Sequence, residues 1–216
     1  MGPNRPTKEE IIKASGLIPQ RVKNIYLFGS RVYGNASKDS DWDILMIANT
    51  PSPEVEIKSP EFNIHILSED RFREGLKQHH IRALECIMAP DWAKIQENIK
   101  FDDFKLNMAS LRHSISHINS NSWVKAKKKL AQGDYYIGLK SLWHSLRIVM
   151  FGSQIARWGY IKDWDCANHI WDELTFKDQP QYMRNKKQWT WEELDKKYRG
   201  LNNELLSGFR LFAPKD

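Results

Sequence analysis

Two short sets of residues in this sequence could carry out chemistry. Gly29 and Ser30 follow the apolar run NIYLF, and Asp41 and Asp43 stand one residue apart at the start of a second apolar run. Aspartate is depleted in β-strands, and a buried carboxylate is unfavourable unless a partner compensates its charge. Because side chains alternate between the two faces of a strand, both aspartates point to the same side, about 7 Å apart along the chain. Two carboxylates held in this way are half of a site for Mg²⁺ or Mn²⁺.

The Gly29-Ser30 pair has the character of a phosphate-binding turn. A glycine lets the backbone turn tightly, and exposed amides with a serine hydroxyl can hold phosphate oxygens. If the two apolar runs are neighbouring strands, this turn lies beside the aspartates. Phosphoryl and nucleotidyl transfer need that layout, because metal ions bridge the phosphates while the chain fixes the line of attack. The alternative is that Ser30 merely caps a helix and that DSDWD ends a surface turn.

Together the two sets resemble the signature of the polymerase-beta-like nucleotidyltransferase superfamily. That signature is an apolar residue, Gly, then Gly or Ser, a short spacer, and Asp-x-Asp or Asp-x-Glu flanked by apolar residues. FGSRVYG followed by SDWDILMI looks like its small-domain branch. The resemblance implies that Gly29 and Ser30 hold the triphosphate of a nucleotide and that Asp41 and Asp43 bind Mg²⁺. Arg31 follows Ser30 as in this branch, where it either touches phosphate or is an outward structural arginine.

Members of this superfamily usually place a third acid on a later strand, where it completes the metal site and often serves as base. The triplet VEI matches this pattern through Glu56, whereas the context FNIHIL favours the position of Asn63. Asparagine can lend a carbonyl oxygen to a metal but cannot act as a base. His65 shares the strand face of Asn63 and could accept a proton near neutral pH, or it is simply a packed histidine. A further alternative is that the chain keeps the nucleotide pocket and has lost turnover.

Hydrophobic periodicity and turn residues predict the elements that position these side chains. In the first half they are a helix over 7–15, strands over 24–28 and 42–47, a hairpin of 54–58 and 61–67, and helical spacing after Ser68. In the second half they are helices over 103–118, 122–131, 134–158, 164–174 and 190–209. The sequence therefore predicts an α+β chain. A nucleotidyltransferase domain with a small mixed sheet occupies residues 1–100, and a basic all-α domain occupies residues 101–216.

The composition is that of an ordinary globular protein, with 41% apolar and 28% charged residues among 216. No apolar run approaches the length of a membrane span, and the first residues do not read as a secretory signal, so no membrane partner is expected. Cys86 and Cys166 stand far apart, in no metal-ligand spacing. They indicate neither a zinc site nor a disulfide framework, and a reducing, cytoplasmic setting fits best.

The positive charge is concentrated in the second half. Residues 101–216 hold 19 Lys/Arg against 13 Asp/Glu, whereas residues 1–100 hold 14 of each. This excess suggests a polyanionic partner, although solubility alone also explains a basic chain. The candidate contacts to a nucleic-acid backbone are Lys125, Lys128, Lys129, Lys140 and Arg147. A lysine run is equally typical of a solvated helix face. The tryptophans of this half could stack on bases, but their spacing of 3 or 4 favours a helical core.

The stretch HSISH, residues 113–117, raises a separate question. Small nucleotidyltransferases are often paired with a ribonuclease-type helical domain that carries Arg, a polar residue and, a few residues on, His. Arg112 and His117 have a compatible separation. However, Arg112 is followed by His113 and the surrounding residues do not match well, so the resemblance assigns this stretch no function.

The predicted activity is metal-dependent transfer of a nucleoside monophosphate from an NTP such as ATP to an acceptor hydroxyl, with release of pyrophosphate. RNA, including tRNA, is the first expectation for the acceptor because the helical half is basic, and a protein side chain or a small molecule stays open as an alternative. Two other functions stay open. One is a catalytically impaired nucleotide- or RNA-binding module on the same fold, which Asn63 favours. The other is a toxin–antitoxin partner that nucleotidylates a protein.

Overall fold

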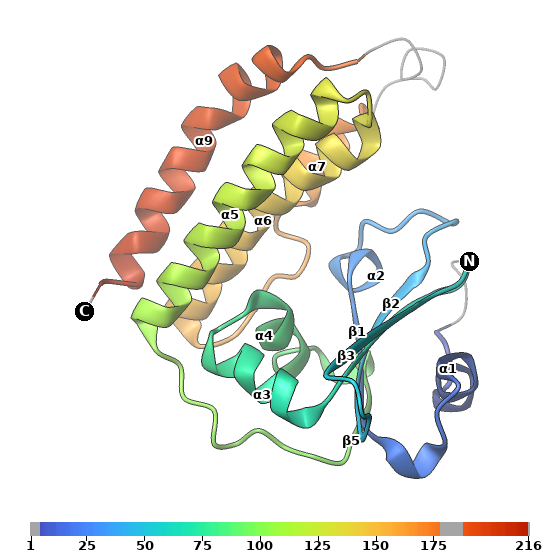
Figure 1. Ribbon diagram of the computed structural model, residues 1–216. Helices are drawn as coiled ribbons and strands as arrows, with labels where there is room; N and C mark the ends of the chain where they lie inside the picture. The colour runs from blue at the N-terminus through green and yellow to red at the C-terminus, as the bar shows by residue number, and fades with distance from the viewer. Residues whose placement is uncertain (1–4, 178–187, 216) are drawn as a thin grey trace. The chain divides into compact units, whose positions relative to one another are not determined.

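The computed structural model of the chain describes residues 5–177 and 188–215. The chain divides into two compact units, Met1–Lys105 and Leu106–Asp216. The fold is α+β, with a mixed sheet in the N-terminal unit and helices in the C-terminal unit (Figure 1). Among the described residues, no helix has the length and apolar character needed to cross a membrane.

The N-terminal unit is built on a five-stranded sheet with the order β3-β4-β2-β1-β5. Its strands are β1 (Val22–Phe28), β2 (Trp42–Ala48), β3 (Glu54–Lys58), β4 (Phe62–Leu67) and β5 (Lys94–Glu97). β1 runs antiparallel to β2 and to β5, β3 runs antiparallel to β4, and β2 runs parallel to β4. The two apolar runs that end at Gly29 and begin at Asp41 are therefore neighbouring strands, as the sequence predicts.

Helices cover both faces of this sheet (Figure 1). α1 (Lys8–Ser15) lies on one face and begins with a capping box formed by Thr7 and Glu10. α3 (Glu69–Lys77) and α4 (Ile81–Ile87) lie on the other face, where the rings of Tyr26 and Phe72 stack with centroids 6.2 Å apart. Since Tyr26 and Phe28 share a face and Phe28 is paired with Asp43, α3 and α4 cover the same face that carries Asp43.

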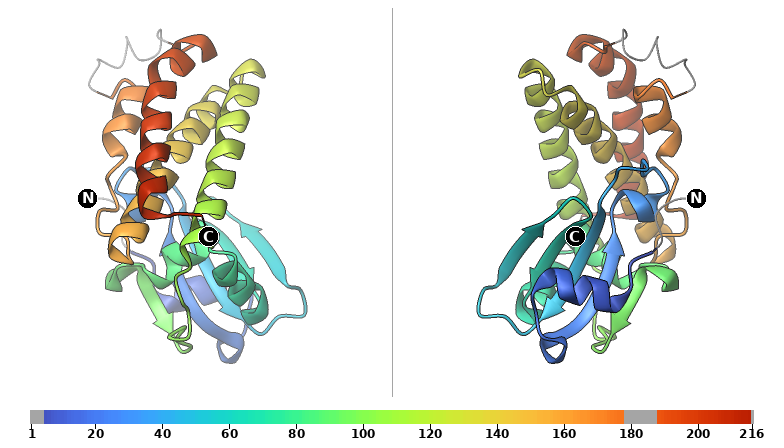
Figure 2. Two further views of the ribbon diagram at one scale, coloured as in Figure 1. Left: turned by 90° about the vertical axis from the view of Figure 1, so that its left-hand side faces the viewer. Right: turned by 90° about the vertical axis from the view of Figure 1, so that its right-hand side faces the viewer.

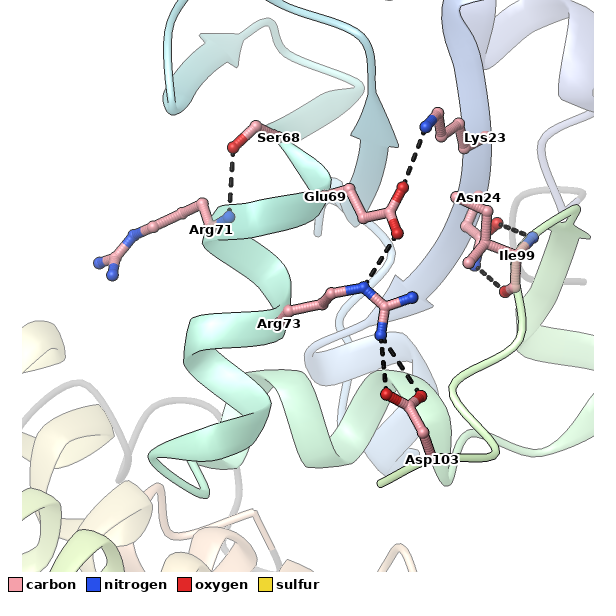
Figure 3. A network of polar contacts seen from close by, with 8 residues as sticks. All are labelled: Lys23, Asn24, Ser68, Glu69, Arg71, Arg73, Ile99 and Asp103. Carbon is pink, nitrogen blue, oxygen red and sulfur yellow. Dashed lines mark hydrogen bonds and ion pairs between the residues drawn. The ribbon is translucent and has the colours of Figure 1, made fainter. Parts of the chain in front are cut away.

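Ion pairs fix α3 to β1 and to the segment after β5 (Figure 3). Glu69, at the start of α3, accepts a 2.9 Å bond from Lys23 Nζ on β1 and another from Arg73 Nε. Arg73 also reaches Asp103, with Nη1 3.2 Å from Oδ2. Both cations lower the pKa of Glu69, chiefly through the hydrogen bonds from Lys23 and Arg73. Lys23, Glu69 and Arg73 are partly exposed and Asp103 is exposed, so solvent screens the network and it orients α3 more than it stabilises the unit.

β5 is a strand that the sequence analysis does not predict. Its four residues KIQE show no clear alternation, and side chains from β1 determine where the segment lies. The buried Asn24 donates to the carbonyl of Ile99 at 2.7 Å and accepts from its amide at 2.9 Å (Figure 3). Gln96 donates to the carbonyls of Val22 and Lys23. Such tertiary hydrogen bonds leave no periodic pattern in the sequence.

The helical stretch predicted after Ser68 is two helices instead of one. Ser68 caps α3 through its hydroxyl, which accepts from the amide of Arg71 at 3.2 Å (Figure 3). α3 ends at Lys77 with Gln78 as its C-cap, and His79 then adopts φ 53°, which interrupts the helix. His80 restarts it, because its ring accepts from the amide of Arg82 as the cap of α4. An apolar periodicity that continues across the break hides it from sequence analysis.

The described part of the C-terminal unit is helical, and its long helices lie alongside one another (Figures 1 and 2). The helices are α5 (Met108–Ala131), α6 (Tyr135–Trp158), α7 (Asn168–Leu174) and α9 (Trp191–Phe212). α5 is continuous where the sequence predicts two helices. Within it the buried Asn119 donates to the carbonyl of Ser145 on α6 and to Oδ1 of Asn202 on α9. The polar residues between 118 and 122, which predict a break between two helices, therefore lie within one helix, where Asn119 makes polar contacts in the core.

Glycines let α5 and α6 approach closely. A Cβ added to Gly152 would lie 2.9 Å from Cγ1 of Ile115, and one added to Gly138 would lie 2.6 Å from Cγ of Leu130. Gly208 in α9 has no atom within 4 Å of such a Cβ. The three positions therefore separate the packing role of a helical glycine from its effect on helix propensity.

We expect Gly152→Ala to lower the free energy of unfolding by about 1–3 kcal/mol, because Ile115 is fully buried and must move. Gly208→Ala should raise it by about 0.5–1 kcal/mol, because alanine favours the helix and meets nothing there. Denaturant unfolding followed by circular dichroism measures both changes. Equal effects of the two substitutions would contradict the tight packing of α5 on α6.

Candidate nucleotide-binding site

The candidate site begins where β1 ends. Gly29 has φ 79° and ψ −163°, a conformation that side-chain-bearing residues almost never adopt. Its carbonyl accepts from the amides of Val32 and Tyr33, which turns the chain into α2 (Ser30–Tyr33). A Cβ at Gly29 would lie 2.0 Å from Oδ2 of Asp43. Only glycine therefore lets the Gly-Ser turn lie against the aspartate of β2.

The two aspartates stand at the start of β2, on the strand between β1 and β4. Asp43 is paired with Phe28 on β1 and with Asn63 on β4, so all three side chains lie on one face of the sheet. Asp41 precedes the first residue of β2 by one position, and the amide of Trp42 between them donates to the carbonyl of Glu61 at 2.8 Å. The turn and the aspartates therefore meet where β1 ends and its neighbour β2 begins.

Asn63 occupies the position next to Asp43 where a third acid is expected. Its Nδ2 donates to Oδ1 of Asp43 at 3.1 Å, while its own Oδ1 is buried and accepts no hydrogen bond. A buried carbonyl oxygen without a donor, beside a carboxylate, fits a cation. Among the described residues, no three or more His, Cys, Asp or Glu side chains gather into a metal cluster. The oxygens of Asp41, Asp43 and Asn63 suit Mg²⁺, which commonly uses one or two carboxylates together with substrate phosphates.

Glu56, the other candidate for the third acid, lies farther from the aspartates. It stands on the edge strand β3, which β4 separates from β2. Its Oε1 is 3.0 Å from Nζ of Lys58 and 3.6 Å from Nε2 of His65. The hydrogen bond from Lys58 lowers the pKa of this exposed carboxyl. The register of the sheet thus places Asn63, and not Glu56, beside Asp43.

His65 lies on the same face as Asn63, two residues along β4. Its Nδ1 is 3.5 Å from Nη1 of Arg82 and its Nε2 is 3.6 Å from Glu56, so both ring nitrogens face charged groups. The side chain is 14% exposed. Burial lowers the pKa of His65, and the charge of Arg82 lowers it further. A neutral imidazole at neutral pH could accept a proton, although its nitrogens already face these two partners.

Arg31 is directed at the backbone that carries the aspartates. Its Nε donates to the carbonyl of Asp41 at 3.2 Å, its Nη2 donates to the carbonyl of Ser40, and its guanidinium lies 4.7 Å from the ring centroid of Trp42. These contacts join α2 to the chain just before β2. They favour the structural reading of Arg31, which holds the turn and the aspartates in one arrangement.

A polar pair beneath this site is missed by the sequence analysis. Glu85 on α4 is 3% exposed, and it accepts a 2.8 Å hydrogen bond from the hydroxyl of Tyr33 on α2. The bond joins the helix that follows the Gly-Ser turn to a helix packed on the sheet. A single acid within the apolar stretch IRALECI was the signal that could have drawn attention to Glu85, but 52 residues separate the partners.

The candidate nucleic-acid contacts of the C-terminal unit fall into three groups. Lys125, Lys128 and Lys140 are exposed, and Lys129 is bound to Asp134 with Nζ 3.1 Å from Oδ2. Arg147 is only 2% exposed and lies between the rings of Trp143 and Phe151, 5.3 and 4.7 Å from their centroids. The expectation that Arg147 contacts nucleic acid is therefore wrong, because the side chain is part of the core.

The tryptophan at position 143 is part of the core as well. Its side chain is buried, and its Nε1 donates to the carbonyl of Ala167 at 2.8 Å. Its ring is also 5.7 Å from that of Trp171 on α7, centroid to centroid. A base cannot stack on a ring enclosed in this way. The core interpretation of the spacing, which the sequence favours, is therefore confirmed for Trp143.

The arrangement described above places a glycine turn after one strand against an Asp-x-Asp pair on the next, which is the layout that the sequence signature predicts. Residues 8–106 match the family model of the nucleotidyltransferase domain. The match covers the N-terminal unit, and it supports both the resemblance to the polymerase-beta-like nucleotidyltransferase superfamily and a transferase activity. The comparison with curated proteins finds no match.

Two solved structures are similar to this chain. One is the spectinomycin adenyltransferase of Enterococcus faecialis, solved with ATP and spectinomycin. It is 14% identical over 95% of this chain and 100% of its own, with a TM-score of 0.48. The other is a nucleotidyltransferase-like protein from Exiguobacterium sibiricum. It is 13% identical over 96% of this chain and 73% of its own, with a TM-score of 0.33. Similarity at this level says nothing about the substrates of this chain.

The contact between Gly29 and Asp43 can be tested with a matched pair of glycines. Gly16, the C-cap of α1, has φ 67° and nothing within 4 Å of an added Cβ, so Gly16→Ala should lower the free energy of unfolding by about 1–2 kcal/mol. Gly29→Ala should lower it more, because the new methyl group also displaces the Asp43 carboxylate. Unfolding curves compare the two. A Gly29→Ala protein no less stable than Gly16→Ala would contradict the contact.

Proposed function

We propose that the chain transfers a nucleoside monophosphate from an NTP to an acceptor hydroxyl and releases pyrophosphate. The observation that carries the proposal is the contact of the Gly29 turn with Asp43. It places groups suited to phosphate next to groups suited to a cation. Ser30, at the start of α2, would contact the triphosphate, and Gly29 would let the backbone approach it. The base for the acceptor hydroxyl is unassigned.

Asp41, Asp43 and the carbonyl oxygen of Asn63 would hold Mg²⁺ or Mn²⁺. When bound there, such an ion would supply positive charge against the charge that develops on the transferred phosphate group. The chain itself contributes positioning. Arg31 fixes the backbone of Ser40 and Asp41, and the register of β2 on β4 holds Asn63 against Asp43. Asn63 cannot take the proton of the acceptor hydroxyl. The titratable group nearest to Asn63 on β4 is His65, which could do so.

RNA, including tRNA, is the acceptor that we propose. The excess positive charge lies wholly in residues 101–216, and Lys125, Lys128 and Lys140 are exposed there. A polyanion with free hydroxyls suits such a surface. Asn63 favours a second candidate function, a nucleotide- or RNA-binding module without turnover, because the site has two carboxylates where three are expected.

Nucleotide binding is tested by thermal shift, with each NTP in the presence and absence of Mg²⁺. At a hundredfold excess over Kd a ligand stabilises by about 2.7 kcal/mol, which corresponds to about 5–10 °C for a chain of this size. We expect a shift that requires Mg²⁺ and is absent from the Asp41→Asn/Asp43→Asn variant. A shift with any NTP in wild type identifies the base. No shift with any of the four would overturn the proposal.

The role of Asn63 is tested by Asn63→Asp. Without metal this variant should be less stable by about 1.5–3 kcal/mol, because the hydrogen bond to Asp43 is lost and two carboxylates meet. Mg²⁺ should restore more stability in the variant than in wild type, since the site then offers three carboxylates. Asn63→Ala, which loses the same bond without adding charge, should show no such recovery. The melting temperature as a function of Mg²⁺ concentration measures the effect.

A further inference from the structure

The C-terminal unit has an open groove of about 670 Å³ that the proposed transfer does not use. It lies between the first half of α5 and the end of α9. Arg112, His113, Ser116 and His117 of α5 line one side, and Arg210 and Lys215 line the other. No described residue that lines the groove is an aspartate or a glutamate. Three cations, two imidazoles and two serine hydroxyls therefore face a space that no described carboxylate lines, which suits an anionic ligand.

Contacts of Arg112, His113 and His117 order the side chains of this groove. Nη1 of Arg112 donates to the carbonyls of Arg210 and Ala213, at 3.4 and 3.1 Å, and so joins α5 to the end of α9. These bonds use one of the three guanidinium nitrogens. The amide nitrogen of Asn121 lies 2.9 Å from Nε2 of His117, so this contact leaves Nδ1 of His117 available to a ligand. The rings of His113 and His117 stack with centroids 6.2 Å apart.

The basic character continues along α5 beyond the groove. The whole helix, Met108–Ala131, contains no aspartate or glutamate. On its exposed face His113, His117, Val124 and Lys128 follow one another at helical spacing. From His113 to Lys128 this face spans about 22 Å at 1.5 Å per residue. The neighbouring Lys129 is the lysine of this run that the nearby acid Asp134 binds.

We propose that this groove and the exposed face of α5 bind the phosphate backbone of a nucleic-acid chain. The cations of the groove and the exposed Lys125 and Lys128 of α5 extend over about 22 Å of a helix without acids, which matches a repeating phosphodiester better than a single small anion. Among the described residues that line the groove there is no Phe, Tyr or Trp, and its cations and hydroxyls favour contact with phosphates over readout of base sequence. The inference deepens the proposed function, on which it rests, because it names the surface that holds the acceptor.

The test is fluorescence anisotropy of a labelled 20-nucleotide oligouridylate with the full chain, in EDTA and without NTP. Binding should weaken with salt. In the groove variant Arg210→Gln/Lys215→Gln, the slope of log K against log salt should fall by about 1.4, because each lost phosphate contact removes about 0.7. At 0.1 M salt this corresponds to about a 25-fold loss of affinity. The matched control Lys162→Gln/Lys196→Gln removes the same charge from exposed positions outside the groove and should keep the wild-type slope.

Three outcomes would overturn the inference. The first is that the wild type does not bind the probe, and the second is that the groove and control variants lose equal affinity. The third is that tripolyphosphate displaces the probe no less effectively than an unlabelled oligonucleotide of equal charge, which would mark a small-anion site. A DNA oligonucleotide of the same length should bind through the same groove, since phosphates are shared. Circular dichroism confirms that both variants fold. Because the assay contains neither metal nor NTP, its failure is distinct from failure of the nucleotide thermal shift.

Discussion

The candidate site depends on how closely the backbone at Gly29 approaches the carboxylate of Asp43. A Cβ at Gly29 would lie 2.0 Å from Oδ2 of Asp43, so the approach requires a residue without a side chain. The antiparallel pairing of β1 with β2 sets the register, and Arg31 ties the following helix to the backbone of Asp41. The turn and the aspartates thus form one preorganised group, which reduces the ordering that a bound triphosphate would impose.

The same register explains why Asn63 matters. β2 and β4 are parallel and pair without a register shift, so the pairing fixes Asn63 as the residue of β4 opposite Asp43. Glu56 lies on the outer strand β3 and cannot take that position. Asn63 offers one buried oxygen and no charge. A site with two carboxylates attracts a divalent cation less strongly than a site with three, so the phosphates of a bound nucleotide would supply more of the negative charge. Metal and nucleotide should therefore bind cooperatively.

The local features of the N-terminal unit could be predicted from the sequence because each has a local physical signal. The apolar runs, the Gly-Ser turn and the Thr7 capping box depend on neighbours in the chain. The contacts that the sequence does not show join distant residues: Glu85 to Tyr33, Asn24 to Ile99, and Asn119 to α6 and α9. Arg147 shows the same limit, because a cation in a helical pattern reads as exposed unless the aromatic rings around it are known.

The two edges of the sheet differ in how they discourage growth by another chain. β3 presents Glu54, Glu56 and Lys58 at one edge, where charged side chains oppose the addition of a neighbouring strand. β5, at the other edge, has four residues, which is too short to guide much backbone pairing. Self-association through a continuous intermolecular sheet is therefore disfavoured on both sides. Recognition by this unit therefore depends on side-chain surfaces, and the sheet supports the site at the ends of its inner strands β1 and β2.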